Sequence, residues 1–361
     1  MARFTAQVNV VLAAGVLLGA AAGALVVQAQ PVSAPGSGSS PEVLGIGSYS
    51  PIVGDLERSL RFYGEVGLTI PAPPRPGPRL YTLNRGLLHM LGTPDGKERH
   101  VAARIPGVNM SAEIVELQNV ERKPTRLRFQ DPGTITLALL VRDVDAVLQT
   151  LRRAGTPILT PGGAPVTMAD GSRSVLVEDP DGRPIVLSQP NPLPETTAPA
   201  ASNVIGARVI WVVNSTEQTA HVYRDVLGGF DVEGDPSFTT DKSLQALTGL
   251  THAQVRRSQL RAPKSPVAFE LLEFKGVDRR PLHTQLQDPG STRMQVRVRN
   301  LDAIVERMKG LGSHVVAKEG TRVPVMPNLW VAVMPDVNNL FLTLFEPCDG
   351  CAPRVPPPEL P

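Results

Sequence analysis

Glu113 and Glu270 are the residues of this sequence with the clearest potential for chemistry. Each opens a Glu-x-x-Glu pattern in an apolar stretch that is predicted to be a β-strand, and the second carboxylates are Glu116 and Glu273. Residues three apart on a strand point to opposite faces, so one carboxylate of each pair faces inward. Burial raises the pKa of a carboxyl group, which makes an inward Glu113 or Glu270 a candidate general base.

Histidine adds one further candidate. His89 lies in the run Leu-Leu-His-Met, which is predicted to be a strand, where it could face the same interior as Glu113. The alternative is a partly buried strand histidine with a backbone partner. None of the six histidines forms a His-x-x-x-His pair, so their spacing does not predict a metal site.

The two glutamates belong to an internal duplication. The segment around Glu113 aligns without a gap with the segment around Glu270. Each residue of the second segment lies 157 positions after its counterpart in the first. The matched segments are 113–124 with 270–281, 130–133 with 287–290, and 141–146 with 298–303. A repeat of this length corresponds to a whole domain of roughly 150 residues. The sequence therefore predicts two related domains, 43–190 and 203–347.

Each copy contains one order of elements twice. A strand at 46–53 leads to Asp55, a helix N-cap, and to a helix at 56–63 with apolar residues at helical spacing. A strand at 136–141 then leads to a helix at 144–154. The other strands predicted for the first copy are 79–83, 87–91, 112–117, 166–168, 174–178 and 184–188. The chain is thus predicted to consist of four β-α-β-β-β modules.

The ends of the chain differ in composition from the domains. Residues 1–29 combine a basic start, an uncharged apolar run and small residues near Ala29, which predicts a secretory signal peptide and export to the periplasm or the cell exterior. The run is also long enough to span a bilayer, so an uncleaved membrane anchor is the alternative. Segments 30–42, 191–202 and 348–361 are predicted to be a flexible leader, a linker and a Pro-rich tail.

Composition excludes some function classes. Lys and Arg total 36 against 34 Asp and Glu, and aromatic residues are only 4%, so neither a polybasic surface nor a base-stacking platform for nucleic acid is expected. Cys348 and Cys351 are the two cysteines, and both lie in the tail. In an exported chain this Cys-x-x-Cys pair favours a small local disulfide over a redox site.

Three motifs carry a family resemblance. They are Val-x-Asp-Leu-x-x-Ser-Leu-x-Phe-Tyr at 53–63, Val-Arg-Asp-Val-Asp-Ala at 141–146 and Asp-Pro-Asp-Gly at 179–182. Together they resemble the vicinal oxygen chelate superfamily, which includes glyoxalase I, bleomycin-resistance proteins and extradiol dioxygenases. The resemblance implies an α+β fold in which four βαβββ modules pair into two tandem cup-shaped domains, with a ligand inside each cup.

The resemblance also implies where a divalent metal would be held. The first ligand position precedes the helix cap by seven residues, and two others lie on later strands. The implied positions are Ser48, Thr136, Arg208 and Arg293, then Glu113 and Glu270, then Val186 and Phe341 or Thr343. Serine, threonine and arginine replace the expected His, Glu or Gln, and arginine repels a cation. We therefore expect no metal or other cofactor, with a residual divalent metal on Glu113 or Glu270 as the alternative.

Two arginines suggest another use for the second cup. If Arg208 and Arg293 face inward with Glu270, the three form either a structural ion cluster or a clamp for a carboxylate or phosphate. The first cup, with Ser48 and Thr136 at the equivalent places, is then expected to lack such charges. The candidate ligand-binding residues are Ser48, His89, Thr136, Arg208, Glu270 and Arg293.

Three functions remain open on these residues. The first is an exported protein that binds a small molecule, with an acidic one favoured by the arginines, without a catalytic metal. The second is a lyase, isomerase or dioxygenase that uses Glu113 or Glu270 as base or residual metal ligand. The third is a structural or interaction module whose cups are filled with side chains.

Overall fold

The first half of the protein contains two modules that differ in length. The structure is a computed structural model and describes residues 42–73, 85–265, 267–326 and 328–348. Module 1 consists of β1 (Glu42–Val53), α1 (Leu56–Glu65), α2 (Arg85–Met90), β2 (Lys97–Arg104) and β3 (Ser111–Gln118). Module 2 consists of β4 (Ile135–Val141), α3 (Val144–Arg153), the 3₁₀ turn η1 (Pro161–Gly163), β5 (Val166–Thr167), β6 (Arg173–Glu178) and β7 (Pro184–Gln189).

The second half repeats this plan. Module 3 consists of β8 (Val204–Val212), α4 (Thr216–His221), the short π-helix η2 (Val222–Val226), β9 (Asp231–Gly234), α5 (Lys242–Thr248), β10 (Gln254–Arg261) and β11 (Ala268–Lys275). Module 4 consists of β12 (Thr292–Arg299), α6 (Leu301–Gly310), β13 (Val323–Met326), β14 (Leu329–Pro335) and β15 (Phe341–Pro347). None of the helices in the described ranges is long and apolar enough to cross a membrane.

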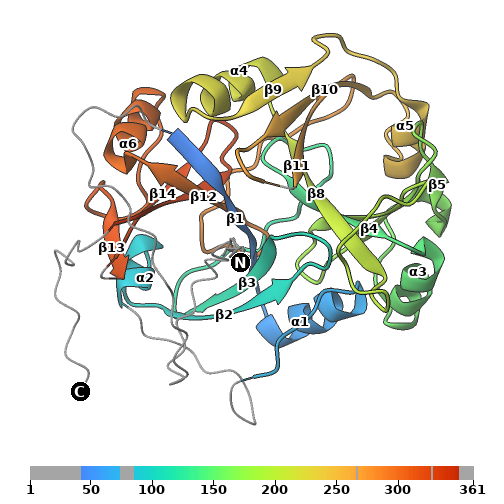
Figure 1. The fold of residues 1–361 in the computed structure, drawn as a ribbon, viewed down its shortest axis with the longest axis horizontal. Coiled ribbons are helices and arrows are strands. Elements are labelled where there is room, and N and C mark those ends of the chain that lie inside the picture. Colours follow the sequence, from blue (N-terminus) through green and yellow to red (C-terminus); the bar gives the residue numbers. More distant parts are fainter. Residues whose placement is uncertain (1–41, 74–84, 266, 327, 349–361) are drawn as a thin grey trace, which may run out of the picture.

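The strands form two curved mixed sheets, each of which contains one module from each half (Figure 1). The first sheet has the order β13-β14-β15-β12-β1-β3-β2, so it joins modules 1 and 4. The second has the order β5-β6-β7-β4-β8-β11-β10-β9, so it joins modules 2 and 3. We call the concave face of the first sheet cup A and that of the second cup B. The predicted fold class, four modules in two glyoxalase-like cups, is confirmed.

The pairing of modules differs from the sequence interpretation. The duplication suggested that each cup is built from two consecutive modules, within 43–190 or within 203–347. Instead, β1 lies antiparallel to β12, with Ser50 opposite Arg293, and β4 lies antiparallel to β8, with Ala138 opposite Arg208. The physical reason is that the odd modules resemble each other, as do the even ones, so an odd strand can pair with either even strand. The repeat pattern does not distinguish the two arrangements.

The main hydrophobic core lies on the faces of the two sheets opposite the cups. It joins residues of both sheets with the buried sides of α1, α3, η2 and α6. Figure 1 shows α1 and α3 together on one side of the molecule and α4 and α6 together on another. Because one continuous core serves all four modules, the two sheets are expected to unfold as a single cooperative unit.

Helix α1 shows how the sequence sets a helix start in this fold. Asp55 is the N-cap, and its side chain accepts a hydrogen bond from the backbone N–H of Arg58. The backbone N–H of Leu56 donates to Glu116 at 2.9 Å, so a buried carboxylate satisfies the helix end from the neighbouring strand. Glu273 does the same in module 3, where it accepts from the N–H of Thr216 at 2.8 Å. Glu116 and Glu273 therefore face the helices, as the alternation of strand residues predicted.

The structure changes one predicted strand into a helix. Residues 87–91 were expected to be a strand, but 85–90 form helix α2, whose Leu87 and Met90 lie in cup A. A short apolar run of leucine and methionine has no β-branched residue, and these residue types favour a helix once the cup offers an apolar surface. The strand predicted at 79–83 falls outside the described residues. Cys348 is disulfide-bonded, and Cys351, the other cysteine of the sequence, falls outside them too.

A buried ion pair ties the second sheet to the first. Arg183 is fully buried after the Asp-Pro-Asp-Gly turn and contacts Asp179 at 2.5 Å. Its guanidinium also donates to the carbonyl oxygens of Ile52 and Ser291 and to the hydroxyl of Thr292. Although burial opposes the charge, Asp179 keeps the pKa of Arg183 above its ordinary value. Removing one member of such a pair usually costs about 3–5 kcal/mol.

The counterpart of this ion pair in module 4 lacks the arginine. Asp336 occupies the equivalent turn, but Leu340 stands where module 2 has Arg183. Asp336 accepts hydrogen bonds from the backbone N–H groups of Asn338 and Leu340 and from the hydroxyl of Tyr223. Burial raises the pKa of Asp336 above its ordinary value, because the carboxylate loses water and, among the described residues, it has no cationic partner such as Arg183.

The module pairing predicts how half of the chain behaves. Residues 43–190 alone keep β1 and β4 but lose β12 and β8, so two apolar strands become open edges. We expect this fragment to dimerise, with the open strands of one copy pairing with those of the other. Size-exclusion chromatography with light scattering measures the mass. A monomeric fragment that unfolds cooperatively would contradict the prediction.

The raised pKa of Asp336 predicts a pH trend in stability. A carboxyl group with a raised folded-state pKa contributes stability below its unfolded pKa, and this contribution is lost as pH rises through the folded pKa. Asp336→Asn should therefore gain stability relative to the wild type as pH rises from 4 to 8. Urea unfolding across this range measures the trend. Asp145→Asn is the control, because a hydrogen bond from Arg173 lowers the pKa of Asp145. The stability that this group contributes is lost only as pH falls below about 4, so the control should show little trend relative to the wild type from pH 4 to 8.

Candidate functional site: two cups of unequal polarity

Glu113 lies on the floor of cup A and is the centre of a buried polar group. Its Oε2 accepts hydrogen bonds from the Ser50 hydroxyl at 3.0 Å and from the Gln295 amide at 2.6 Å. The guanidinium of Arg293 lies 3.8 Å from the same oxygen, and the side chains of Arg293 and Glu113 are each only 4% exposed. These residues thus come from β1 and β3 in the first half of the chain and from β12 in the second half.

Strand β2 adds a second polar pair to cup A. His100 is opposite Val115 and Glu98 is opposite Leu117, so both lie on the same face of the sheet as Glu113. The Nδ1 of His100 lies 2.7 Å from the Glu98 carboxylate. Glu98 is almost completely buried and its carboxylate fixes the orientation of the imidazole, which is itself mostly buried. A carboxylate in this position is the usual way to orient a histidine that exchanges a proton or a hydrogen bond.

A small cavity lies between these polar groups and an apolar wall. The cavity has a volume of about 30 Å³, which is room for about two water molecules. Helix α2 contributes Leu87 and Met90 to the wall, and strands β13 to β15 contribute the rest. The cavity is lined by Leu87, Met90, Glu98, His100, Glu113, Arg293, Gln295, Val325, Leu329, Val331, Thr343 and Phe345. Burial lowers the pKa of Arg293, against the attraction of Glu113 and Glu98.

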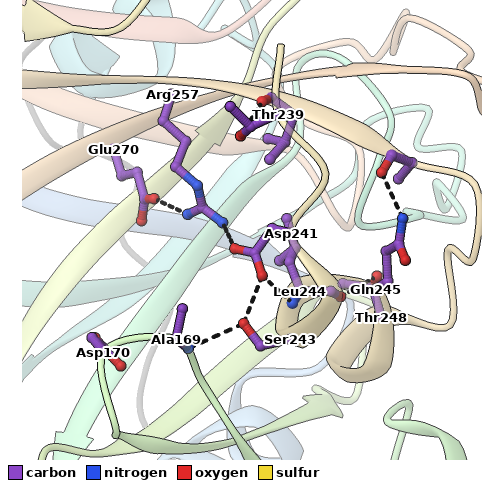
Figure 2. A network of polar contacts seen from close by, with 12 residues as sticks. Ala169, Asp170, Thr239, Asp241, Ser243, Leu244, Gln245, Thr248, Arg257 and Glu270 are labelled. Carbon is purple, nitrogen blue, oxygen red and sulfur yellow. Dashed lines mark hydrogen bonds and ion pairs between the residues drawn. The ribbon is translucent and has the colours of Figure 1, made fainter. Parts of the chain in front are cut away.

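Cup B holds the second glutamate in a different environment. Glu270 accepts a hydrogen bond from Arg257 at 2.6 Å, and the other end of that guanidinium bonds to Asp241 at 2.5 Å (Figure 2). Asp241 is also the N-cap of α5, because its side chain accepts from the N–H of Leu244. Although partial burial opposes it, hydrogen bonds from Ser243 and Leu244 lower the pKa of Asp241. The Arg257 side chain is 38% exposed, so this network lies at the mouth of the cup.

The floor of cup B is apolar where cup A is polar. Ile210, Ala138 and Val186 occupy the places that Ser50, Gln295 and Thr343 occupy in cup A. They pack with residues of α5 and with neighbouring aromatic rings in one buried cluster. The cluster consists of Phe129, Ala138, Leu176, Val186, Ile210, Val212, Leu244, Leu247, Ala253, Val255, Leu272 and Phe274. Cup B is therefore filled with side chains.

The predicted cluster of Arg208, Arg293 and Glu270 is wrong. Arg293 lies in cup A beside Glu113, because module 4 pairs with module 1. Arg208 does share the cup B face with Glu270, since the residue opposite Glu270 is Ile210, two positions further along the same strand. Within the described residues, however, Glu270 pairs with Arg257 and not with Arg208. The expectation that the first cup lacks charge is wrong for the same reason.

The remaining predicted residues lie near the cups without forming one site. Ser48 lies in the cup A sheet and bonds to the hydroxyl of Ser111 at 2.8 Å. Thr136 is fully buried in β4, in the cup B sheet. His89 is on helix α2 rather than on a strand, and its ring pairs with Glu319 on the partly exposed side of the helix. The imidazole that accompanies Glu113 in cup A is His100 instead.

Sequence reasoning missed Ser50, Gln295, Glu98 and His100. Two of them are on the predicted face of a predicted strand, because Ser50 is two residues after Ser48 and Gln295 is two residues after Arg293. The error was a shift of one side-chain repeat along the strand, which leaves the face unchanged. The alternation Glu98-Arg99-His100, followed by apolar residues, was a signal for a strand with an inward histidine and glutamate.

Comparison with known proteins agrees with this architecture. Residues 45–187 match the family model of the Glyoxalase/Bleomycin resistance protein/Dioxygenase superfamily. This match places residues 45–187 in that superfamily. No curated protein matches the chain.

Solved structures related to this superfamily cover most of the chain. A mutant of glyoxalase I from Zea mays has a TM-score of 0.51 and 15% identity, over 85% of this chain and 94% of that one. A second mutant of the same protein has a TM-score of 0.50 and 16% identity, over 85% and 92%. A putative dioxygenase from Bacillus subtilis has a TM-score of 0.48 and 12% identity, over 86% and 87%. At such identities the likeness of the glyoxalase I structures concerns the fold alone.

The residues of cup A do not fit the divalent metal that the superfamily fold implies. At the four floor positions Ser50, Glu113, Gln295 and Thr343, a single carboxylate is combined with two hydroxyls and an amide, and Glu98 and His100 lie on the neighbouring strand β2 paired with each other. Within the described ranges, no group of three or more His, Cys, Asp or Glu is arranged to hold a metal ion. Arg293 also places a positive charge 3.8 Å from Glu113, where it would repel a cation.

The two glutamates should differ in their importance for stability. Glu113→Ala removes the acceptor of Ser50 and Gln295 and leaves Arg293 buried beside an empty position. We expect a loss of about 3–5 kcal/mol in the free energy of unfolding. Glu270→Ala should cost at most about 1 kcal/mol, because Arg257 is partly exposed and keeps Asp241 as a partner. Urea unfolding of both variants measures the difference. A larger loss in the free energy of unfolding for Glu270→Ala than for Glu113→Ala would contradict the prediction.

Proposed function

We propose that this protein is an exported small-molecule-binding member of the superfamily that uses cup A as its ligand site and works without a catalytic metal. The observation that carries the proposal is the contrast between the cups. Cup A keeps a cavity beside buried charged side chains, whereas Ile210, Ala138 and Val186 fill the floor of cup B where cup A has Ser50, Gln295 and Thr343. Burying charged side chains beside a cavity lowers the stability of the fold unless they are fully paired. A ligand that pairs with them would explain why they are there.

The chemistry of Glu113 supports binding over base catalysis. A general base needs a carboxylate oxygen that can reach a substrate proton. The Oε2 of Glu113 already accepts two hydrogen bonds and lies near Arg293. These contacts hold the carboxylate as a fixed part of the cup floor. Glu270 is a weaker candidate for a general base than Glu113, because its carboxylate forms an ion pair with Arg257.

A second candidate function rests on the His100–Glu98 pair. A buried carboxylate that orients an imidazole beside a cavity is the arrangement of a histidine general base. A metal-free isomerase or lyase that moves a proton through His100 is therefore the alternative. Turnover by the metal-free protein that is lost in His100→Gln would favour this enzyme over the binder.

Export is the part of the proposal that rests on sequence alone. Residues 1–29 carry the pattern of a signal peptide and fall outside the described residues. N-terminal sequencing of the mature protein from the culture or the periplasm should begin at or near Gln30. Recovery of Met1 in the membrane fraction would instead identify an uncleaved anchor.

Metal content and ligand-induced stabilisation test the binding proposal together. We expect the purified protein to contain no stoichiometric zinc, nickel, manganese or iron, and chelation by EDTA to leave its thermal midpoint unchanged. A panel of small polar molecules should contain members that raise the midpoint in a concentration-dependent way. In nitrogen-15 NMR spectra, these ligands should perturb amides of β2, β3 and β12. Amides of β8, β10 and β11 are the internal control, and perturbations confined to them would overturn the assignment to cup A.

A further inference from the structure

Three buried polar atoms of the cup A lining have no hydrogen-bond partner among the described residues. They are Oε2 of Glu98, Nε of Arg293 and Oγ1 of Thr343. The three residues are 1%, 3% and 5% exposed, respectively, and all of them line this cavity. They come from β2, β12 and β15, so they converge from three strands and two modules. Buried polar atoms are normally paired, so three unpaired ones around one cavity indicate what the cavity is built to hold.

The chemistry of these atoms defines a complementary pattern. A carboxylate oxygen can only accept a hydrogen bond, whereas a guanidinium Nε–H can only donate one. The hydroxyl of Thr343 can do either. A molecule that satisfies all three must present a donor toward Glu98 and an acceptor toward Arg293. At its third contact, with Thr343, the molecule can present either a donor or an acceptor.

The charges around the cavity determine the charge of the molecule. Glu98 and Glu113 provide two negative charges, and Arg293 provides one positive charge, with His100 adding a second when it is protonated. The lining is therefore neutral or carries one net negative charge. An anion would add charge that the lining does not balance, so the pattern favours a neutral molecule over an acid.

We propose that cup A recognises a neutral head group in which a carbonyl acceptor lies beside an N–H or O–H donor, as in a carboxamide. The carbonyl accepts from Arg293 Nε, and the donor bonds to Glu98 Oε2. An apolar tail lies against the wall formed by Leu87, Met90 and Phe345. This inference rests on the proposed function and specifies the ligand class of the same cup. The present cavity holds only a small head group, so longer tails require Leu87 and Met90 of α2 to move.

Four probes of nearly equal size separate the possible head groups. Propionamide offers an acceptor and a donor, butanone only an acceptor, propionate only acceptors with a negative charge, and propionamidinium only donors with a positive charge. Ligand-observed NMR measures the four dissociation constants on the full-length protein. Propionamide should bind about tenfold more tightly than butanone or propionate, because each of those leaves the Glu98 oxygen unpaired. It should also bind more tightly than propionamidinium, which leaves Arg293 unpaired.

Glu98→Gln should invert this preference. If the amide oxygen of the new glutamine stays on the His100 Nδ1–H, its amide nitrogen presents an N–H donor to the cavity in place of an acceptor. Two donors and one fewer negative charge then favour an acceptor-only ligand. Propionate should become the tightest of the four probes, and propionamide should lose its advantage. A loss of all binding without inversion would identify Glu98 as a packing residue and would overturn the recognition scheme.

A matched pair of hydroxyl deletions provides the control. Thr343→Val removes the unpaired hydroxyl of cup A while keeping the shape of the side chain, and Thr136→Val does the same for a buried unpaired hydroxyl in β4 of the other sheet. Both variants should fold at least as stably as the wild type, because each loses an unsatisfied polar atom. Only Thr343→Val should weaken propionamide binding, by about threefold to tenfold. Equal effects of the two variants would contradict the proposal.

The outcomes separate this inference from the proposed function. If the four probes perturb cup A amides with equal affinity, cup A binds small molecules but the donor–acceptor pattern is wrong. If no probe and no member of the wider panel perturbs cup A, the cavity holds water alone, and both the inference and the proposed function fail. Preference for propionamide with inversion in Glu98→Gln supports both.

Discussion

The antiparallel pairing of β1 with β12 and of β4 with β8 is the contact on which the rest of this structure depends. It joins the first strands of modules from different halves of the chain, and therefore decides which residues share a cup. Through it, Ser50 lies opposite Arg293, and the Gln295 amide reaches Glu113 across 182 positions of sequence. The same pairing places both ends of the described chain in one sheet. Neither half therefore contains a complete cup.

The duplication has produced two halves that use equivalent positions differently. At the hairpin turns, module 2 buries an Arg183–Asp179 pair, whereas module 4 buries Asp336 with Leu340 in the place of the arginine. On the cup floors, one glutamate is surrounded by donors and a buried guanidinium, and the other lies at the mouth beside a partly exposed arginine. In both contrasts, a buried cation lies beside a buried anion that offsets part of the cost of losing water. Arg183 lies beside Asp179 in the module 2 turn, and Arg293 lies beside Glu113 in cup A.

Short helices complete the two cups in different ways. Helix α5 packs Leu244 and Leu247 into the apolar floor of cup B, and Asp241, its N-cap, is joined to Glu270 through Arg257. Helix α2 places Leu87 and Met90 over cup A but leaves a cavity beneath them. The difference lies in what faces each helix. Polar side chains at the floor of cup A do not pack against leucine as closely as Ala138, Val186 and Ile210 do, so space remains where hydrogen-bonding groups are concentrated.

The sequence by itself determined the local features of this protein. The helix cap at Asp55 and the alternation that turns Glu116 and Glu273 away from the cups depend on residues close together in the chain, and the repeat at 157 positions can be found by comparing the sequence with itself. The four-module plan followed from these patterns, whereas the resemblance to the superfamily came from the motifs at 53–63, 141–146 and 179–182. What only the tertiary structure decided was which modules meet. Similar modules offer similar strand edges, so sequence similarity does not choose between the two pairings. That choice moved Arg293 to Glu113, gave Glu270 a different arginine, and brought His100 and Glu98 to the same cavity.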